Sequence, residues 1–274
     1  MNRPKGKIVV LVVAIIVVFA LNFPVYWMFV QSITSESMFT ERPSLLPKAP
    51  SFDAFRRICE AKPMGQWFVN TLIVAVGTVV LSMPLAAGAA FSLSRYKTTL
   101  NSITGLAILG TQMLSASLLA IPIYVLFRRT GLHDKLGGLI VANTAFTLPM
   151  SIWVLKGFFD AIPKELDEAA MIDGCSVGQM IWKVIMPLVL PGIVAVSIFA
   201  FILAWDEFFF ARTLVTSQGN WVMSVGLSSF REEFTIQWSD MMAAAVLFTI
   251  PPILLFMFIQ KHLVSGLTGG AVKG

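Results

Sequence analysis

The sequence predicts an all-α integral membrane protein with six transmembrane helices, and three observations support this fold class. Hydrophobic residues make up 57% of the 274 residues and charged residues 13%, against roughly 45–50% and 25% in soluble domains. The mean hydropathy is +0.80. Seven uncharged runs are 18 residues or longer, and a helix needs about 20 mostly apolar residues to cross a bilayer. This composition argues against a soluble fold, a disordered regulator and a nucleic-acid-binding protein.

Six of the seven runs predict spans. The run 213–230 is rich in Ser, Thr, Gly, Asn and Gln, so we expect it to be a polar loop. The first span follows three basic residues, as a signal peptide would, but its apolar stretch is longer than a signal requires, so a retained helix is preferred. The spans are expected near 8–30, 67–93, 101–127, 137–158, 191–212 and 241–261.

Charge alone does not orient these spans. If the N-terminus is inside, ten Lys and Arg residues fall on each side, so the positive-inside rule gives a draw. The basic cluster before the first span favours an inside N-terminus. Two Cys and two His are too few for a disulfide framework or a structural zinc site, and we expect no catalytic residues and no metal ligands.

Two short helices are predicted between the fourth and fifth spans, in the segment 160–190. Pro163 suits a first helical position, where its missing N–H has no helical partner, and Gly174 suits a left-handed stop. Negatively charged side chains in the first turns of a helix interact favourably with the positive end of the helix dipole. The acidic residues there are Glu165, Asp167 and Glu168.

A second helix is expected after this stop. Ser176 and Gln179 have the spacing of a capping box, and the helix should run to Pro187–Pro191. A small apolar face on the first helix comprises Leu166, Ala169 and Ala170. A short helix outside the bilayer cannot bury such a face alone. It predicts either packing on the chain's own surface or docking into a groove of another protein.

The same segment resembles the E-A-A signature of ABC importer permeases, E-A-A-x3-G-x9-I-x-L-P. The matching residues are Glu168-Ala169-Ala170, Gly174 and Val184-x-Met186-Pro187, with Val and Met in place of Ile and Leu. Two further segments are similar to maltose-type carbohydrate permeases, in particular to the subunit without a large extracytoplasmic insertion. They are Trp205-Asp206-Glu207-Phe208 and the ending Leu263–Gly274. The resemblance therefore covers most of the chain.

The resemblance implies the type I ABC importer permease fold, in the bacterial cytoplasmic (inner) membrane, with both termini cytoplasmic. The implied order is an N-terminal helix (1–30), an extracytoplasmic loop (31–66), a core domain (67–262) with a cytoplasmic coupling segment (160–190) and an extracytoplasmic loop (213–239), and a cytoplasmic tail (263–274). The coupling segment would dock in a cleft of an ATPase. The residues implied are Glu165, Leu166, Asp167, Glu168, Ala169, Ala170, Met171, Asp173 and Gly174.

The chain contains no G-x-x-x-x-G-K-[ST] loop, so we expect it not to be an enzyme and to bind no cofactor itself. ATP and Mg²⁺ would belong to a partner ATPase. The resemblance implies two ATPase subunits, a second and non-identical permease, an extracytoplasmic solute-binding protein and membrane lipid as partners, and no nucleic acid. The cargo would be a sugar or a sugar derivative.

Polar and ionisable groups in spans are candidates for a solute pathway. They are Gln112, Asn143, Trp205, Asp206 and Glu207. An aromatic ring beside two carboxylates has the groups for sugar recognition, although a structural role as a helix cap or ion pair is preferred for these acids. A loop contact with the binding protein is expected at Gln218, Gly219, Asn220 and Trp221, and the alternative is a plain surface turn.

Two other functional classes remain as alternatives. A secondary transporter or channel working without ATP predicts buried charge near the midplane and inverted repeats, and neither is visible in the sequence. A membrane-embedded enzyme predicts a nucleophile–base pair or a metal site. The two His residues lie at span ends, which does not favour either.

Overall fold

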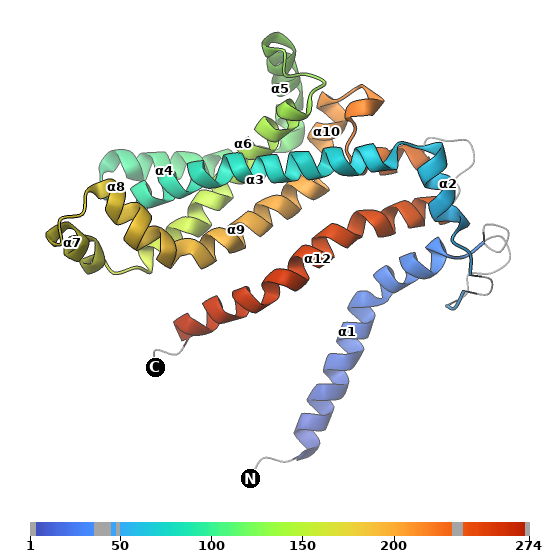
Figure 1. Cartoon of the computed structure of the whole chain (residues 1–274), viewed down its shortest axis with the longest axis horizontal. Coiled ribbons are helices and arrows are strands. Elements are labelled where there is room, and N and C mark those ends of the chain that lie inside the picture. Colours follow the sequence, from blue (N-terminus) through green and yellow to red (C-terminus); the bar gives the residue numbers. More distant parts are fainter. Residues whose placement is uncertain (1–3, 36–44, 48–49, 232–237, 272–274) are drawn as a thin grey trace. The chain divides into compact units, whose positions relative to one another are not determined.

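A computed structural model of the chain describes residues 4–35, 45–47, 50–231 and 238–271, with side chains for all of these except 4–8 and 258–271. The described residues form helices, together with one isolated bridge between Thr34 and Pro50. The main helices are α1 (Pro4–Ser32), α2 (Asp53–Ala61), α3 (Met64–Arg95), α4 (Thr99–Thr111), α5 (Ala116–Thr130), α6 (Leu136–Asp160), α7 (Glu165–Ile172), α8 (Val177–Gln179), α9 (Met186–Asp206), α10 (Phe209–Leu214), α11 (Met223–Ser228) and α12 (Trp238–Ala271), as labelled in part in Figure 1. Three short helical turns lie between them: η2 (Met180–Ile185), η3 (Gln218–Asn220) and η4 (Ser229–Arg231).

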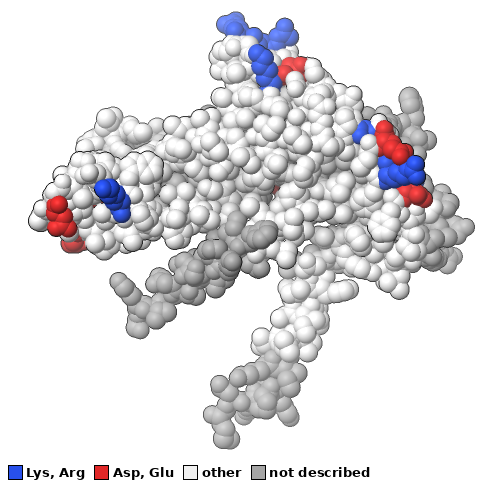
Figure 2. Space-filling model, viewed as in Figure 1, with Lys and Arg blue, Asp and Glu red and all other residues white. Residues whose placement is uncertain are grey.

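Among the described residues, five helices are long and apolar enough to cross a membrane, and a sixth crossing results if α4 and α5 together count as one broken span. The five are Val9–Ser32, Met64–Arg95, Leu136–Asp160, Val177–Asp206 and Trp238–Met257. The predicted all-α membrane class is confirmed. Figure 2 agrees with it, because charged side chains on the face shown gather in a few groups and uncharged residues cover the rest of the described part of that face.

The third predicted span, 101–127, is wrong as a continuous helix. The axes of α4 and α5 differ by 99°. Gln112 closes α4 by donating its N–H to the Leu109 carbonyl at 3.0 Å, and Ser115 begins α5 by accepting the Ser117 N–H at 3.3 Å. Hydropathy did not reveal the break because α4 ends and α5 begins, at its N-cap Ser115, inside one uncharged run of the sequence.

The fifth predicted span, 191–212, also has different bounds. Helix continues from Val177 to Asp206 through the π-helical turn η2, so the predicted helix end at Pro187–Pro191 is wrong. In η2 the Met186 N–H bonds to the carbonyl of Ile181, five residues back. Pro187 then lies in the first residues of α9, where its missing N–H costs little.

Contacts divide the chain into two compact units, described separately. The first comprises residues 1–65 and 226–250, and the second comprises residues 66–225 and 251–274. In the first unit, Arg57 of α2 pairs with Asp240 of α12 at 2.6 Å. Parts of the predicted loops 31–66 and 213–239 and of the tail 263–274 lie outside the described residues.

Helices α3, α6 and α9 pack closely in the second unit, as Figure 1 shows. A Cβ on Gly192 of α9 would lie 2.4 Å from the ring of Phe158 of α6, and a Cβ on Gly77 of α3 would lie 2.5 Å from Ile140 of α6. Small residues at such contacts let the helix backbones approach. The core of this bundle includes Ala170 of α7, so the segment after α6 is anchored to it.

Candidate functional site

Helix α7 is the first of the two short helices predicted in the segment 160–190. It begins at Glu165 with Lys164 as the N-cap, so Pro163 lies two residues before the first helical position that was predicted for it. The three acidic residues predicted for the first turn are confirmed there, at the positive end of the helix dipole. Figure 2 shows acidic side chains gathered over the α7 end of the second unit.

The predicted stop after α7 is confirmed. Gly174 has a φ of +85°, in the left-handed region that favours glycine. The Cys175 N–H donates to the Ala170 carbonyl at 3.0 Å and the Gly174 N–H donates to the Met171 carbonyl at 3.1 Å. These two bonds form a Schellman motif, which satisfies carbonyls that the helix end would leave unpaired. They fix the direction in which the chain leaves α7.

The capping box that starts the second helix is also confirmed. The Ser176 hydroxyl accepts the Gln179 N–H at 3.4 Å, and the Gln179 side-chain oxygen accepts the Ser176 N–H at 3.0 Å. Only a single residue, Cys175, separates the Gly174 stop from this cap. The turn between the helices is therefore hydrogen-bonded both to the end of α7 and to the start of α8, and it connects α7 firmly to the continuous helix that leads into α9.

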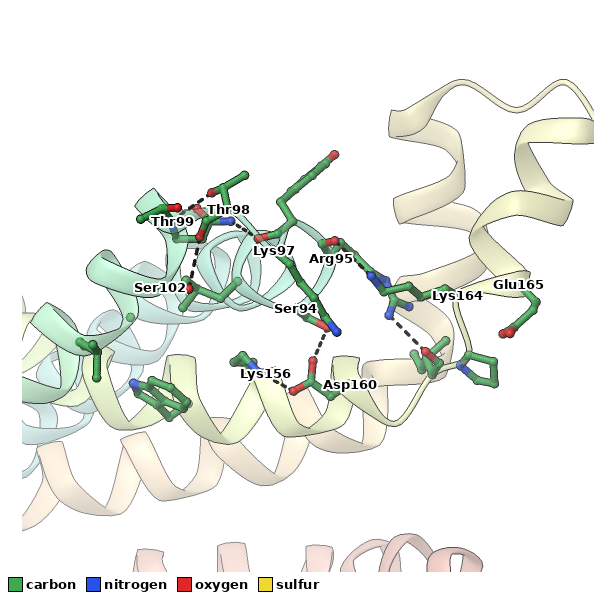
Figure 3. A pocket seen from close by; sticks show the side chains of 18 residues that line it. Ser94, Arg95, Lys97, Thr98, Thr99, Ser102, Lys156, Asp160, Lys164 and Glu165 are labelled. Carbon is green, nitrogen blue, oxygen red and sulfur yellow. Dashed lines mark hydrogen bonds and ion pairs between the residues drawn. The ribbon is translucent and has the colours of Figure 1, made fainter.

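Arg95, at the end of α3, fixes the other end of α7, and the sequence analysis did not identify it. Its Nε lies 2.7 Å from Oδ2 of Asp167 as an ion pair, and its Nη2 donates a hydrogen bond to Oδ1 at 3.3 Å. Its Nη1 donates to the carbonyls of Phe159 and Ile162 at 3.2 and 3.1 Å, and Figure 3 shows the side chain reaching this turn. Because the Arg95 side chain is 6% exposed and that of Asp167 18%, this pair is a buried link between α3 and α7.

The two faces of α7 differ. Ala170 is buried in the core of the second unit, so at this residue the predicted apolar face packs on the chain's own bundle, which was one of the two expectations for it. The other side of the helix is exposed and mixes apolar and acidic side chains. It comprises Glu165, Leu166, Glu168, Ala169, Met171, Ile172 and Asp173. Ile172 is 86% exposed, so α7 presents an uncovered surface of the kind that a partner groove covers.

Three predicted pathway residues lie where α9 ends, and two of them, Trp205 and Glu207, make structural contacts. Trp205 is fully buried, with its ring 5.5 Å from that of Phe201 and 5.6 Å from that of Phe68. The Glu207 carboxylate accepts the N–H groups of Phe210 and Ala211 at 2.7 and 2.9 Å. It therefore caps α10, which was the preferred expectation.

Asp206 ends α9 and is exposed. The structure thus separates it from Trp205, although the two are neighbours in sequence. An aromatic face and two carboxylates are not presented together to one solute in this conformation.

The other two pathway candidates occupy different surroundings. Gln112 lines a cavity of about 430 Å³ at the break between α4 and α5, with Phe146 and Pro149 of α6. Asn143 does not line that cavity. It is 3% exposed, and its Oδ1 is buried without a hydrogen-bond partner among the described residues. An unpaired amide oxygen in a spanning helix is costly.

The loop residues Gln218 to Trp221 lie together and are held by α3. The Gln218 carbonyl accepts the Trp67 indole N–H at 3.1 Å. Asn70 donates to the carbonyls of Gly219 and Trp221 at 2.8 and 2.9 Å. Trp221 also packs on Trp67, with ring centroids 5.7 Å apart.

Asp134, in the turn between α5 and α6, holds the same loop from the other side and was not identified from the sequence. Its φ of +57° is a conformation that Asp tolerates. Its Oδ1 accepts the N–H groups of Thr216 and Ser217 at 3.0 and 2.9 Å, and its Oδ2 accepts the Ser217 hydroxyl. Its carbonyl accepts the Asn220 side chain at 2.7 Å. The loop is therefore fixed by hydrogen bonds on both sides.

These bonds predict an acid-sensitive contribution to stability. Burial raises the pKa of Asp134, but hydrogen bonds from the hydroxyl and N–H of Ser217 and from the N–H of Thr216 outweigh it and hold the pKa below the ordinary value of 3.8. A lowered folded-state pKa stabilises the protein above the unfolded-state pKa, and this stabilisation disappears as the pH falls through the folded value. We expect Asp134→Asn to lower the Tm at neutral pH. The difference from wild type should shrink as the pH falls below 3.8 and vanish only below the lowered folded-state pKa of Asp134.

The control for this experiment is Glu60→Gln, which removes an exposed charge that pairs with Arg56 on the same helix. Its Tm is expected to stay near that of wild type at neutral pH. Equal Tm values for Asp134→Asn and wild type at neutral pH would show that Asp134 does not stabilise the loop.

Comparison with known proteins places these features in a family. The family model described as "Binding-protein-dependent transport system inner membrane component" matches residues 4–269. The chain is 36% identical over 272 residues to the diacetylchitobiose uptake system permease protein DasC of Streptomyces coelicolor, with 98% of both chains covered. It is 34% identical over 254 residues to the trehalose transport system permease protein SugB of Mycobacterium tuberculosis, with 92% of both covered.

A solved structure supports the fold independently. A chain of a bacterial ABC transporter involved in the import of the acidic polysaccharide alginate superimposes with a TM-score of 0.80 at 24% identity. The superposition covers 95% of this chain and 98% of that one. At this identity the match shows the fold, and it agrees with the predicted fold class.

Proposed function

Because the chain belongs to the binding-protein-dependent transport system inner membrane components, we propose that α7 couples ATP hydrolysis in separate subunits to the passage of a sugar through this chain. The chain is a multi-pass protein of the bacterial inner membrane and a permease subunit of a carbohydrate ABC importer. We further propose that a second, non-identical permease completes the pathway. Two ATPase subunits would then bind ATP and Mg²⁺, and the E-A-A segment would dock on one of them.

The two-sided character of α7 is the observation that carries this proposal. One side is fixed to the bundle by Ala170 and by the Arg95–Asp167 ion pair. The other side exposes acidic and apolar side chains, including Glu168 and Ile172. A helix held firmly on one face and uncovered on the other is suited to transmit a force from a partner to its own chain.

The connections of α7 give this force a route. The Schellman stop at Gly174 and the capping box at Ser176 join α7 to the 30-residue span Val177–Asp206, and Arg95 joins it to the end of α3. If the ATPase pair closes on ATP, α7 moves with it as a rigid element, and α3 and α9 are displaced together. Shifts of packed helices are a general route between two conformational states of a protein, and here they would exchange inward-open and outward-open states.

The opposite end of the same unit would meet the solute-binding protein. The loop from Gln218 to Trp221 is held by α3 and by Asp134, so it presents a preformed edge, and preformed edges lose little conformational entropy on docking. The cargo class is a sugar or sugar derivative, in keeping with the oligosaccharide uptake named for the relatives. Asn143 and Gln112 are the proposed contributions of this chain to the pathway.

Reconstitution tests this function against a transporter that works without ATP. The chain, its partner permease and the ATPase subunits are placed in proteoliposomes with the binding protein and a labelled sugar. We expect uptake only with hydrolysable ATP, and none with a non-hydrolysable analogue. Uptake by this chain alone, driven by a solute or ion gradient, would instead establish a secondary transporter or channel.

A further inference from the structure

We propose that a pocket beside α7 binds the phosphate headgroup of an anionic phospholipid. The pocket has a volume of about 1110 Å³. Its walls are the end of α3, the first turns of α4, the last turns of α6 and the chain that leads into α7, all within the second unit (Figure 3). It is separate from the exposed face of α7 proposed to meet the ATPase, except that Glu165 borders both.

The charge of the pocket favours an anion. Four basic side chains line it against two acidic ones. They are Arg95, Lys97, Lys156 and Lys164 against Asp160 and Glu165. Arg95 already pairs with Asp167, and Lys156 pairs with Asp160 at 2.5 Å. The Asp160 carboxylate is further satisfied by the Ser94 hydroxyl at 2.6 Å.

Lys97 and Lys164 are the two cations that remain for a ligand. Both are exposed, and Figure 3 shows them on the pocket walls contributed by the α3–α4 turn and the start of α7. Lys164 makes a long contact of 3.4 Å from its Nζ to the carbonyl of Arg95. A phosphate oxygen could replace this contact with a stronger bond in which both the donor and the acceptor are charged.

The N-terminus of α4 adds to this positive potential. Thr98 caps the 13-residue helix, and Thr99 and Ser102 of its first turn line the pocket. The positive end of the helix dipole and the hydroxyl groups of such a turn suit phosphate oxygens. The helix end supports the lysines here and is not the basis of the site.

The depth of the pocket distinguishes a lipid from a soluble anion. The apolar spans α3 and α6 end at Arg95 and Asp160, both in its wall, so the pocket lies at the level where lipid headgroups begin. Its deeper wall is apolar and includes Leu106, which is 68% exposed, and Trp153. A polar mouth above an apolar wall matches a headgroup with its acyl chain, and basic pockets between spanning helices are typical headgroup sites.

The binding requires only that α3 and α6 cross a membrane. That the site faces the cytoplasm rests on the proposed function, since it lies at the α7 end. Loss of ATP-driven uptake would overturn the proposed function without touching the lipid site, and absence of lipid binding would leave the coupling role of α7 intact.

Native mass spectrometry of the full chain in detergent tests the site. Phosphatidylglycerol or phosphatidylcholine with matched acyl chains is titrated against wild type, Lys97→Gln/Lys164→Gln and Lys183→Gln. Lys183 is exposed on η2 and does not line the pocket, so it is the matched control. Melting without lipid checks that each variant folds.

We expect wild type and Lys183→Gln to retain phosphatidylglycerol in preference to phosphatidylcholine. The double variant should bind phosphatidylglycerol on the order of tenfold more weakly, given the worth of each lysine near an anionic surface. Equal retention of the two lipids by wild type, or an equal loss in the Lys183→Gln control, would overturn the proposal. Binding of inorganic phosphate at this site without any binding of phosphatidylglycerol would also overturn it.

Discussion

Replacing Glu168 by Arg in the assembled importer is expected to lower ATP-driven sugar uptake by at least about tenfold. Glu168 is exposed on the free side of α7, so the change leaves the anchoring contacts of Ala170 and Asp167 in place. It reverses one charge in the proposed interface with the ATPase, and the like-charge contacts that such a reversal creates cost several kcal/mol. The measurements are uptake in proteoliposomes and co-purification of the ATPase with the membrane subunits.

Two variants control this experiment. Glu60→Arg makes the same substitution at an exposed position of α2, on the side expected to be extracytoplasmic, and uptake should stay within about twofold of wild type because an exposed i,i+4 pair contributes little. Glu168→Gln removes charge without reversing it and should give an intermediate loss. Normal uptake with Glu168→Arg would contradict a role for the free face of α7.

Replacing Arg95 by Ala is expected to uncouple ATP hydrolysis from uptake. The substitution leaves Asp167 poorly solvated and removes the donors to the carbonyls of Phe159 and Ile162. Breaking a buried ion pair by removing one partner costs about 3–5 kcal/mol, which is comparable to the whole stability of a marginal segment. The free face of α7 is unchanged, so the ATPase should still associate and hydrolyse ATP while uptake falls.

Hydrogen exchange gives the structural readout for Arg95→Ala, since amides of 163–175 should exchange faster while those of α9 stay protected. Arg95→Lys is expected to rescue only part of the uptake, because one ammonium cannot replace a guanidinium that serves a carboxylate and two carbonyls. The double variant Arg95→Ala/Asp167→Asn should be more stable than Arg95→Ala. Full coupling in Arg95→Ala would show that α3 is not part of the route.

Local sequence chemistry predicted where α7 ends and where the next helix begins. The left-handed stop at Gly174 and the capping box of Ser176 and Gln179 depend on a few neighbouring residues, and both are confirmed. The six apolar segments and the all-α class follow from composition in the same way. Glu207 as a helix cap was also a preferred alternative, and the structure bears it out.

Features that depend on distant partners were not predictable in this way. In the sequence Arg95 is one basic residue at the end of a predicted span. Its contact with α7 is made through residues 64 to 72 positions away in the sequence. Helical spacing grouped Ala170 with Leu166 and Ala169 on one face, but it did not say which of these residues meets the bundle. The bend near Gln112 and the π-helical turn before Pro187 were not predicted, because both change the backbone hydrogen bonding within apolar sequence and leave the hydropathy unchanged.

Disulfide cross-linking between α7 and the ATPase tests the central claim most directly. In an assembled importer with Cys59 and Cys175 replaced by Ser, a single cysteine is introduced at Ala169 and paired with cysteines lining the cleft of the ATPase. We predict a cross-link from Ala169→Cys whose yield changes when ATP is added, and none from Glu60→Cys. The coupling role of α7 would be contradicted if the complex is intact but Ala169→Cys, like Glu60→Cys, forms no cross-link with the ATPase.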